Sequence, residues 1–192
     1  MYTLQGVQSF SASTQARAHL CTDDSIVCGI DPGTRHLAIK FGSSSFKDLG
    51  TYLIDLGSDK SKVMANLVTN MHELRHLFAM TRVVVVEGQI RQNVPMARIE
   101  AALVSSIASH ASTECTIMAV PTSTKDNYIK RTLGKQGKIK RNELKRLACS
   151  LAKSKMQNVN DESTLAVMQG TSKKDDIADA YIYHLIGLEH LG

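Results

Sequence analysis

The amino-acid sequence predicts a single α/β domain. Five short runs of apolar, largely β-branched residues are typical of strands. Before and after the fourth and fifth of these runs, apolar residues recur at helical spacing. The predicted order is three strands, helix, strand, helix, strand and then helices. No internal repeat or linker divides the chain of 192 residues, which is long enough to bury a sizeable core.

The first three strands are predicted to form an antiparallel meander. Residues 25–30 (SIVCGI) form a β-branched run that an Asp-Pro-Gly sequence breaks. The chain then resumes as HLAIKFGS at residues 36–43, and the turn between the two runs indicates a hairpin. The third strand is predicted at residues 51–56, TYLIDL.

The rest of the chain alternates helical and extended patterns. Four consecutive valines at residues 83–86 are typical of a central strand buried on both faces, and TIMAV at residues 116–120 predicts the last strand. Residues 157–174 are polar and without clear periodicity, which predicts a loop with at most a short element inside it. Apolar spacing predicts helices over residues 60–78, 96–110, 142–155 and 175–191.

Composition and charge narrow the class of protein. Hydrophobic residues make up 43% of the chain, and no apolar run approaches the roughly 18–20 residues of a membrane span, so no membrane partner is expected. The net charge of +5 and the pI of about 9.0 favour an anionic partner such as nucleic acid. Residues 1–24 are polar and rich in Ser, Thr and Gln, and we expect a flexible N-terminal arm before a domain spanning residues 25–192.

Four carboxylates follow the predicted elements in a pattern that indicates a metal site. Asp31 comes directly after the first strand, Glu87 directly after the valine strand, and Asp176 and Asp179 share one face of the last helix. Asp176 and its neighbour Asp175 are also typical of a first helical turn, where acids are favoured by the helix dipole, and either of the two could serve as the ligand.

Such a cluster needs cations to be stable. Four carboxylates meeting in space would repel one another, and divalent ions remove that repulsion. Hard oxygen ligands select Mg²⁺ or Mn²⁺ over zinc. Two such ions roughly 4 Å apart activate a water and stabilise the leaving oxygen of a phosphodiester. The cluster therefore predicts a metal-dependent nuclease.

The same residues resemble a known family. Strand–Asp31-Pro-Gly-Thr34, strand–Glu87-Gly-Gln and the late helical Asp176-Ile-Ala-Asp179-Ala180 resemble the RuvC-type Holliday-junction resolvases of the RNase H-like superfamily, and within it the pox-type resolvases of large DNA viruses. The resemblance extends from about Ser25 to Leu191. It implies a five-stranded mixed sheet flanked by helices, and an intracellular protein of the cytoplasm or of a viral replication compartment rather than of mitochondria.

The resemblance also implies a mechanism. It implies two Mg²⁺ ions, for which Mn²⁺ would substitute, and a homodimer that nicks a four-way DNA junction symmetrically. Asp31 would bridge both ions, and Glu87, Asp176 and Asp179 would be further ligands. The helix at residues 94–110 lies where the family places its dimer interface, although its apolar face could equally be core.

DNA contacts are predicted in two places. Residues 125–146 contain nine Lys and Arg residues against two acids, and Gly134 and Gly137 predict a flexible basic loop that binds phosphates, with a solvated helix face as the alternative. Polar residues after Glu87 could bind DNA or cap the next helix. The predicted DNA-binding residues are Gln89, Arg91, Lys130, Lys138, Lys140 and Arg141, of which Lys130 and Lys140 match the spacing of basic residues in the family.

Three other functions are compatible with parts of this pattern. Asp-x-Gly-Thr after a strand also resembles the phosphate loop of sugar kinases and actin-like ATPases, but this chain is too short for their two domains and lacks their second glycine-rich motif. A second alternative has the same fold but a different substrate: an RNase H-like enzyme that acts on RNA–DNA hybrids, flaps or other branched nucleic acid. A non-enzymatic DNA-binding module is disfavoured, because carboxylates near phosphates weaken binding.

Overall fold

The computed structural model describes residues 24–89 and 92–191, so the predicted arm lies outside the described residues except for Asp24. Five strands form one sheet in the order β3-β2-β1-β4-β5. Their bounds are β1 (Ile26–Pro32), β2 (His36–Ser43), β3 (Asp48–Asp55), β4 (Thr81–Gly88) and β5 (Thr116–Pro121).

The sheet is mixed, as predicted. β1 pairs with β2, and β2 with β3, in antiparallel register, which confirms the meander. β4 lies parallel to both β1 and β5. The valine strand β4 is therefore central, and its run Val83–Val86 is buried on both faces.

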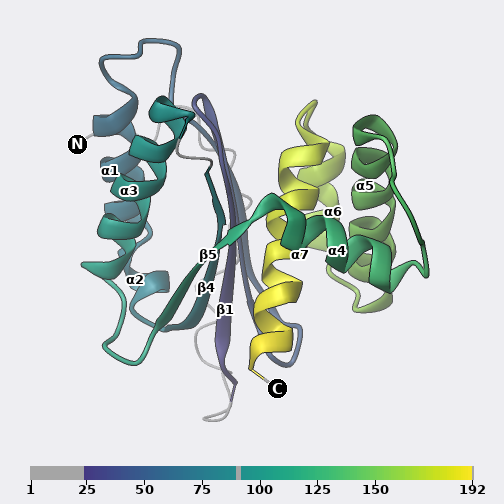
Figure 1. Cartoon of the computed structure of the whole chain (residues 1–192). Helices are drawn as coiled ribbons and strands as arrows, with labels where there is room; N and C mark the ends of the chain where they lie inside the picture. Colours follow the sequence, from purple (N-terminus) through teal and green to yellow (C-terminus); the bar gives the residue numbers. More distant parts are fainter. Residues whose placement is uncertain (1–23, 90–91, 192) are drawn as a thin grey trace.

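Helices cover both faces of the sheet (Figure 1). One face carries α1 (Val63–Glu73), α2 (Arg75–Phe78) and α3 (Val94–Ala108). The other carries α4 (Thr122–Thr132), α5 (Arg141–Asn158), α6 (Glu162–Gln169) and α7 (Lys174–His190), with α7 packed on the sheet and α5 packed on the outer side of α7. None of the helices in the described ranges is long and apolar enough to cross a bilayer.

Two elements differ from the prediction, and α6 is the short element that the predicted loop allowed. The helix predicted over residues 60–78 is divided at Leu74 into α1 and α2. α6 forms inside the predicted loop, because the side chain of Asp161 caps it by accepting a hydrogen bond from the Thr164 amide. α4 occupies the start of the predicted flexible basic loop, because Tyr128 and Ile129 bury their side chains against the other helices.

The apolar face of α3 belongs to the core of the chain. Met96, Ile99, Leu103 and Ile107 are buried with residues of β1, β4 and α1. Of the two interpretations of this helix, the structure therefore supports core packing for these four side chains.

Helix α7 lies unusually close to β1. A Cβ atom added to Gly29 would lie 2.1 Å from the backbone nitrogen of His184 and 2.2 Å from the carbonyl oxygen of Ala180. Only a glycine permits this approach of backbone to backbone. Gly29 thus sets the distance between α7 and the strand that carries Asp31.

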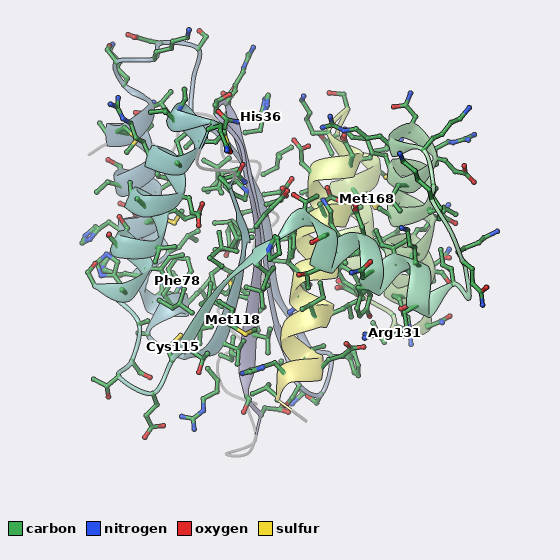
Figure 2. The ribbon with its side chains drawn as sticks, in the orientation of Figure 1. His36, Phe78, Cys115, Met118, Arg131 and Met168 are labelled. Carbon is green, nitrogen blue, oxygen red and sulfur yellow. The ribbon has the colours of Figure 1, made fainter. Side chains whose placement is uncertain are left out.

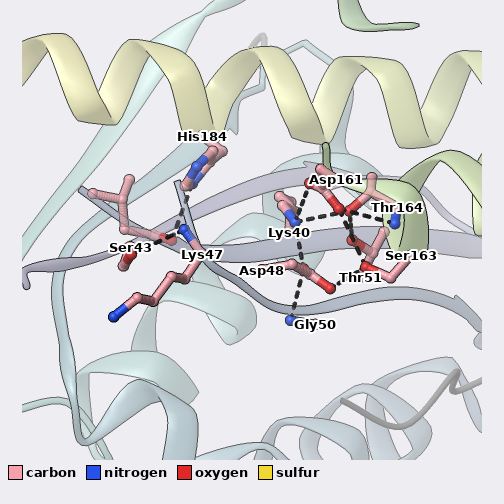
Figure 3. A network of polar contacts seen from close by, with 11 residues as sticks. Lys40, Ser43, Lys47, Asp48, Gly50, Thr51, Asp161, Ser163, Thr164 and His184 are labelled. Atoms are coloured by element: carbon pink, nitrogen blue, oxygen red, sulfur yellow. Dashed lines mark hydrogen bonds and ion pairs between the residues drawn. The ribbon is translucent and has the colours of Figure 1, made fainter. Parts of the chain in front are cut away.

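A buried ionic network joins β2 and β3 to α6 (Figure 3). The side chain of Lys40 is 2% exposed, and its ammonium donates to the carboxylates of Asp48 and, at 2.8 Å, Asp161. It also donates to the Thr164 hydroxyl at 2.7 Å, which pairs with Thr51. Burial alone would raise the pKa of Asp161, but the charge and hydrogen bond of Lys40 outweigh it and lower that pKa.

Lys40→Met is expected to lower the free energy of unfolding by about 3 kcal/mol at pH 7, the low end for a broken buried ion pair, because both carboxylates keep hydroxyl or amide donors. The pKa of folded Asp161 lies below its unfolded value near 3.8, so the stabilisation is present above that pH and is lost as the pH falls below it. Urea unfolding from pH 7 to pH 3 should show the two proteins converging. Lys62→Met, at a side chain 72% exposed, is the control. A constant difference down to pH 3 would contradict the role of Lys40.

Candidate active site

Asp31 and Glu87 meet because of the register between β1 and β4. Ile30 and Val86 are paired across these parallel strands, so the next residue of each strand lies at the same end and on the same face. The two carboxyl groups lie close enough for each to shift the pKa of the other. The sequence predicted both residues directly after their strands. In the structure each is the second-to-last residue of its strand, since β1 runs to Pro32 and β4 to Gly88.

Helix α7 brings Asp179 to the same place. Tyr183 packs on Val27, Val83 and Val85, which lie on the sheet face that also carries Asp31 and Glu87. Asp179 precedes Tyr183 by four residues, so it lies one turn away on the same side of α7. The negative charge of Asp179 accordingly acts on Asp31. The structure thus unites Asp31, Glu87 and Asp179.

Lys125 of α4 completes this cluster, and we did not single it out from the sequence. Its ammonium is ion-paired with Asp179 and lies 3.8 Å from Glu87 Oε2, and its side chain is 9% exposed. Thr122, at the start of the same helix, donates to Glu87 Oε1 at 2.5 Å. Thr122 directly follows β5, the neighbour of β4, and Lys125 lies in the next helical turn, so their position after a strand end is the signal that could have indicated them.

The pKa values follow from this packing. Burial, together with the hydrogen bond and charge of Glu87 and the charge of Asp179, raises the pKa of Asp31 well above its usual value. Burial would also raise the pKa of Glu87, but hydrogen bonds from Asp31 and Thr122 and the charge of Lys125 lower it. Burial would lower the pKa of Lys125, yet the surrounding carboxylates raise it. Asp31 is therefore the acid that most readily holds a proton, while Lys125 stays charged.

Asp176 lies at the edge of the cluster and faces a cavity of about 620 Å³. Asp31 lines the same cavity, together with the β1–β2 turn and the residues before α7. Asp175, the alternative ligand, instead forms an ion pair with Lys145 at 2.7 Å. This arrangement favours Asp176 over Asp175 as the fourth acid. The polar and basic side chains lining the cavity are Thr34, Arg35, His36, Ser172 and Lys173.

The carboxylate oxygens of this cluster suit a hard divalent cation, although in the metal-free protein Lys125 is their positively charged partner. Within the described ranges, no group of three or more His, Cys, Asp or Glu side chains is arranged as a metal site as it stands. The oxygens of Asp31, Glu87 and Asp179 are nevertheless the donors that Mg²⁺ and Mn²⁺ prefer. An ion bound here would compete with the pairing of Lys125 and Asp179.

Of the predicted DNA-binding residues, Gln89 lies beside the cluster, where its side-chain amide donates to the backbone carbonyl of Glu87 at 3.2 Å, whereas the described basic residues lie on or near α4 and α5. The backbone amide of Gln89 donates to Glu100 at 2.7 Å, which fixes Gln89 after β4. Arg91 lies outside the described residues. In the described chain, the ion pairs of the cluster involve Lys125 but none of the predicted basic contacts. Lys130 is half-buried on α4, whereas Lys138, Lys140 and Arg141 are exposed around the start of α5.

The two basic regions occupy different parts of the molecule. Figure 2 shows His36 at the end of the sheet where β1 finishes, and Arg131 at the C-terminal end of α4, away from that end. The turn between α4 and α5 lies on the outer side of the helical layer (Figure 1). Arg35 and Lys173, which we did not single out from the sequence, line the same cavity as Asp31 and Asp176, and Arg35 is also ion-paired with Asp55 at 3.7 Å.

The architecture is the RNase H-like α/β fold that the sequence predicted: a meander, two further parallel strands and helices on both faces. Among solved structures it is similar to RuvC of T. thermophilus in complex with a Holliday junction substrate, with 17% sequence identity and a TM-score of 0.51. The similarity covers 84% of this chain and 90% of that chain. No protein-family model matches the sequence, and no curated protein is significantly similar to it.

Proposed function

We propose that the protein is a divalent-metal-dependent endonuclease that resolves four-way DNA junctions by paired symmetric nicks. The observation that carries this proposal is the convergence of Asp31, Glu87 and Asp179 from two strands and a helix at one end of the sheet. Divalent cations would remove the repulsion between the carboxylates at such a site. A pair of such cations would promote hydrolysis of a phosphodiester.

Each member of the site has a separate task in this proposal. Asp31, Glu87 and Asp179 would hold two Mg²⁺ or Mn²⁺ ions, with Asp176 on the side of the cavity. The ions would activate a water and stabilise the leaving oxygen. Lys125 neutralises the carboxylates of the metal-free protein, and once released its ammonium is free to bind a phosphate oxygen.

Branched DNA is the proposed substrate because of charge and fold together. The cavity beside Asp31 and Asp176 carries Arg35 and Lys173, and the whole chain has a net charge of +5. The fold is that of a protein whose solved structure contains a Holliday junction substrate. Paired nicks need two active sites, so we further propose a homodimer.

The test is cleavage of a synthetic four-way junction by the purified full-length chain, with and without Mg²⁺. Symmetric nicks in the junction, abolished by a chelator and far slower on linear duplex, are the expected result, from a protein that light scattering shows to be a dimer. Cleavage of an RNA–DNA hybrid or a flap by a monomer would replace the junction with the alternative substrate class. If none of these substrates is cleaved in Mg²⁺ or Mn²⁺, the nuclease proposal is overturned.

A further inference from the structure

Tyr183 is a buried polar residue directly beneath the acidic cluster. Its side chain is fully buried, and its ring packs on Val27, Val83 and Val85 of β1 and β4. Within the described part of the chain, its hydroxyl is the buried side-chain polar atom that has no hydrogen-bond partner. An unpaired buried hydroxyl costs free energy, so its presence beside a candidate active site requires a reason.

The surroundings of this hydroxyl point toward Glu87. Lys125, whose ammonium lies 3.8 Å from Glu87 Oε2, also lies over the Tyr183 ring, and at neutral pH a phenol keeps the proton that it can donate. Its approach to Glu87 is close enough to lower the pKa of that carboxyl, but falls short of a regular hydrogen bond. The ammonium of Lys125 lies 5.4 Å from the centre of the tyrosine ring.

We propose that Tyr183 is a positioning residue for Glu87, and that its hydroxyl donates a hydrogen bond to this carboxylate when a divalent cation is bound. The inference rests on the proposed function, because it requires a cation at Glu87. Release of Lys125 removes a positive partner from Glu87, and the carboxylates that ligate metals are themselves held by hydrogen bonds from neighbouring groups. Thr122 supplies one such bond already, and Tyr183 is placed to supply a second.

Tyr183→Phe isolates the hydroxyl, because it keeps the ring that packs on the valines and lies under Lys125. Mn²⁺ binding measured by calorimetry should weaken by about 10-fold or more, the usual effect of losing a partner of a metal ligand. The metal-free protein should be at least as stable in urea as the wild type, because the hydroxyl that is lost has no partner. A purely structural hydrogen bond would give the opposite change in stability.

Tyr181→Phe is the matched control on the same helix. Tyr181 lies beside Lys40, whose ammonium is 5.9 Å from its ring centre, and belongs to the buried network rather than to the cluster. Its loss should leave Mn²⁺ affinity unchanged. In a Glu87→Gln background, the effect of Tyr183→Phe should largely disappear, because the two residues act through one hydrogen bond.

Three results would overturn the inference, and they are distinguishable. Wild-type Mn²⁺ affinity in Tyr183→Phe shows that the hydroxyl does not position a ligand. Weaker binding together with a loss of metal-free stability assigns Tyr183 to the fold alone. A wild-type protein that binds no Mn²⁺ removes the proposed metal site, and with it both the function and the role of Tyr183.

Discussion

Asp31→Asn is expected to lower the single-turnover rate of Mg²⁺-dependent junction cleavage by about 10³-fold or more, while binding of the junction persists. The carboxyl groups of Glu87 and Asp179 both act on Asp31. Asparagine keeps its shape and can donate its amide to Glu87, but it offers no anionic oxygen to a cation. Gel-based cleavage and electrophoretic binding assays measure the two effects separately.

The same variant should not be less stable than the wild type at pH 7 without metal. The pKa of Asp31 is raised in the folded protein, so its contribution to stability is present below the unfolded value near 3.8 and is lost as the pH rises above it. Asparagine does not titrate, so the variant does not lose this stability as the pH rises. Urea unfolding of the variant therefore shows whether inactivity comes from the site or from the fold.

Asp175→Asn is the control for this experiment, because Asp175 is acidic and adjacent to Asp176 but is paired with Lys145. It should retain most of the cleavage activity, whereas Asp176→Asn should lose much of it. An active Asp31→Asn protein would contradict the proposed site. An inactive Asp175→Asn protein with an active Asp176→Asn protein would reassign the fourth acid.

Gly29→Ala is expected to lower the free energy of unfolding by about 4 kcal/mol, more than the usual 1–3 kcal/mol for an overpacked core. The added Cβ would meet backbone atoms of Ala180 and His184 at 2.1–2.2 Å, and backbone atoms cannot rotate away as a side chain can. Relief requires α7 to move away from β1. Asp179, next to Ala180, would move with it and leave Asp31.

Urea unfolding and Mn²⁺ binding of the folded fraction check both consequences of Gly29→Ala. Gly170→Ala is the control, because this residue has φ −76° at the end of α6 and its added Cβ would lie no nearer than 3.3 Å to another atom. That variant should lose far less stability than Gly29→Ala, because its contact needs a shift of only a few tenths of an ångström. A Gly29→Ala protein with wild-type stability would show that α7 is not held against β1 as the structure has it.

Much of the fold could be predicted because its signals are local. Strand runs, helical spacing and the breaks at Asp-Pro-Gly and Pro121 each involve a few consecutive residues, and all five strands were placed from them. α4 was not predicted, and α6 was predicted only as a short element of open type, because contacts with distant residues hold both helices. Asp161 at the start of α6 is paired with Lys40, 121 residues earlier.

In the candidate site too, some residues were predicted from local patterns and others depend on tertiary contacts. Asp31 and Glu87 were indicated by their places at strand ends, and Asp176 and Asp179 by their spacing on one helix. Lys125 was seen only as one member of a basic segment, since its pairing with Asp179 spans 54 residues and depends on β5 lying beside β4.

Local patterns of the sequence were enough to predict the strands, the main helices and the four acids, because periodicity and chain breaks involve neighbouring residues. The groups that surround those acids follow from tertiary contacts. The parallel register of β1 and β4 and the contact of α7 with Gly29 bring together Lys125, Tyr183 and three carboxylates. Such contacts join residues far apart in the chain, and no local pattern encodes them.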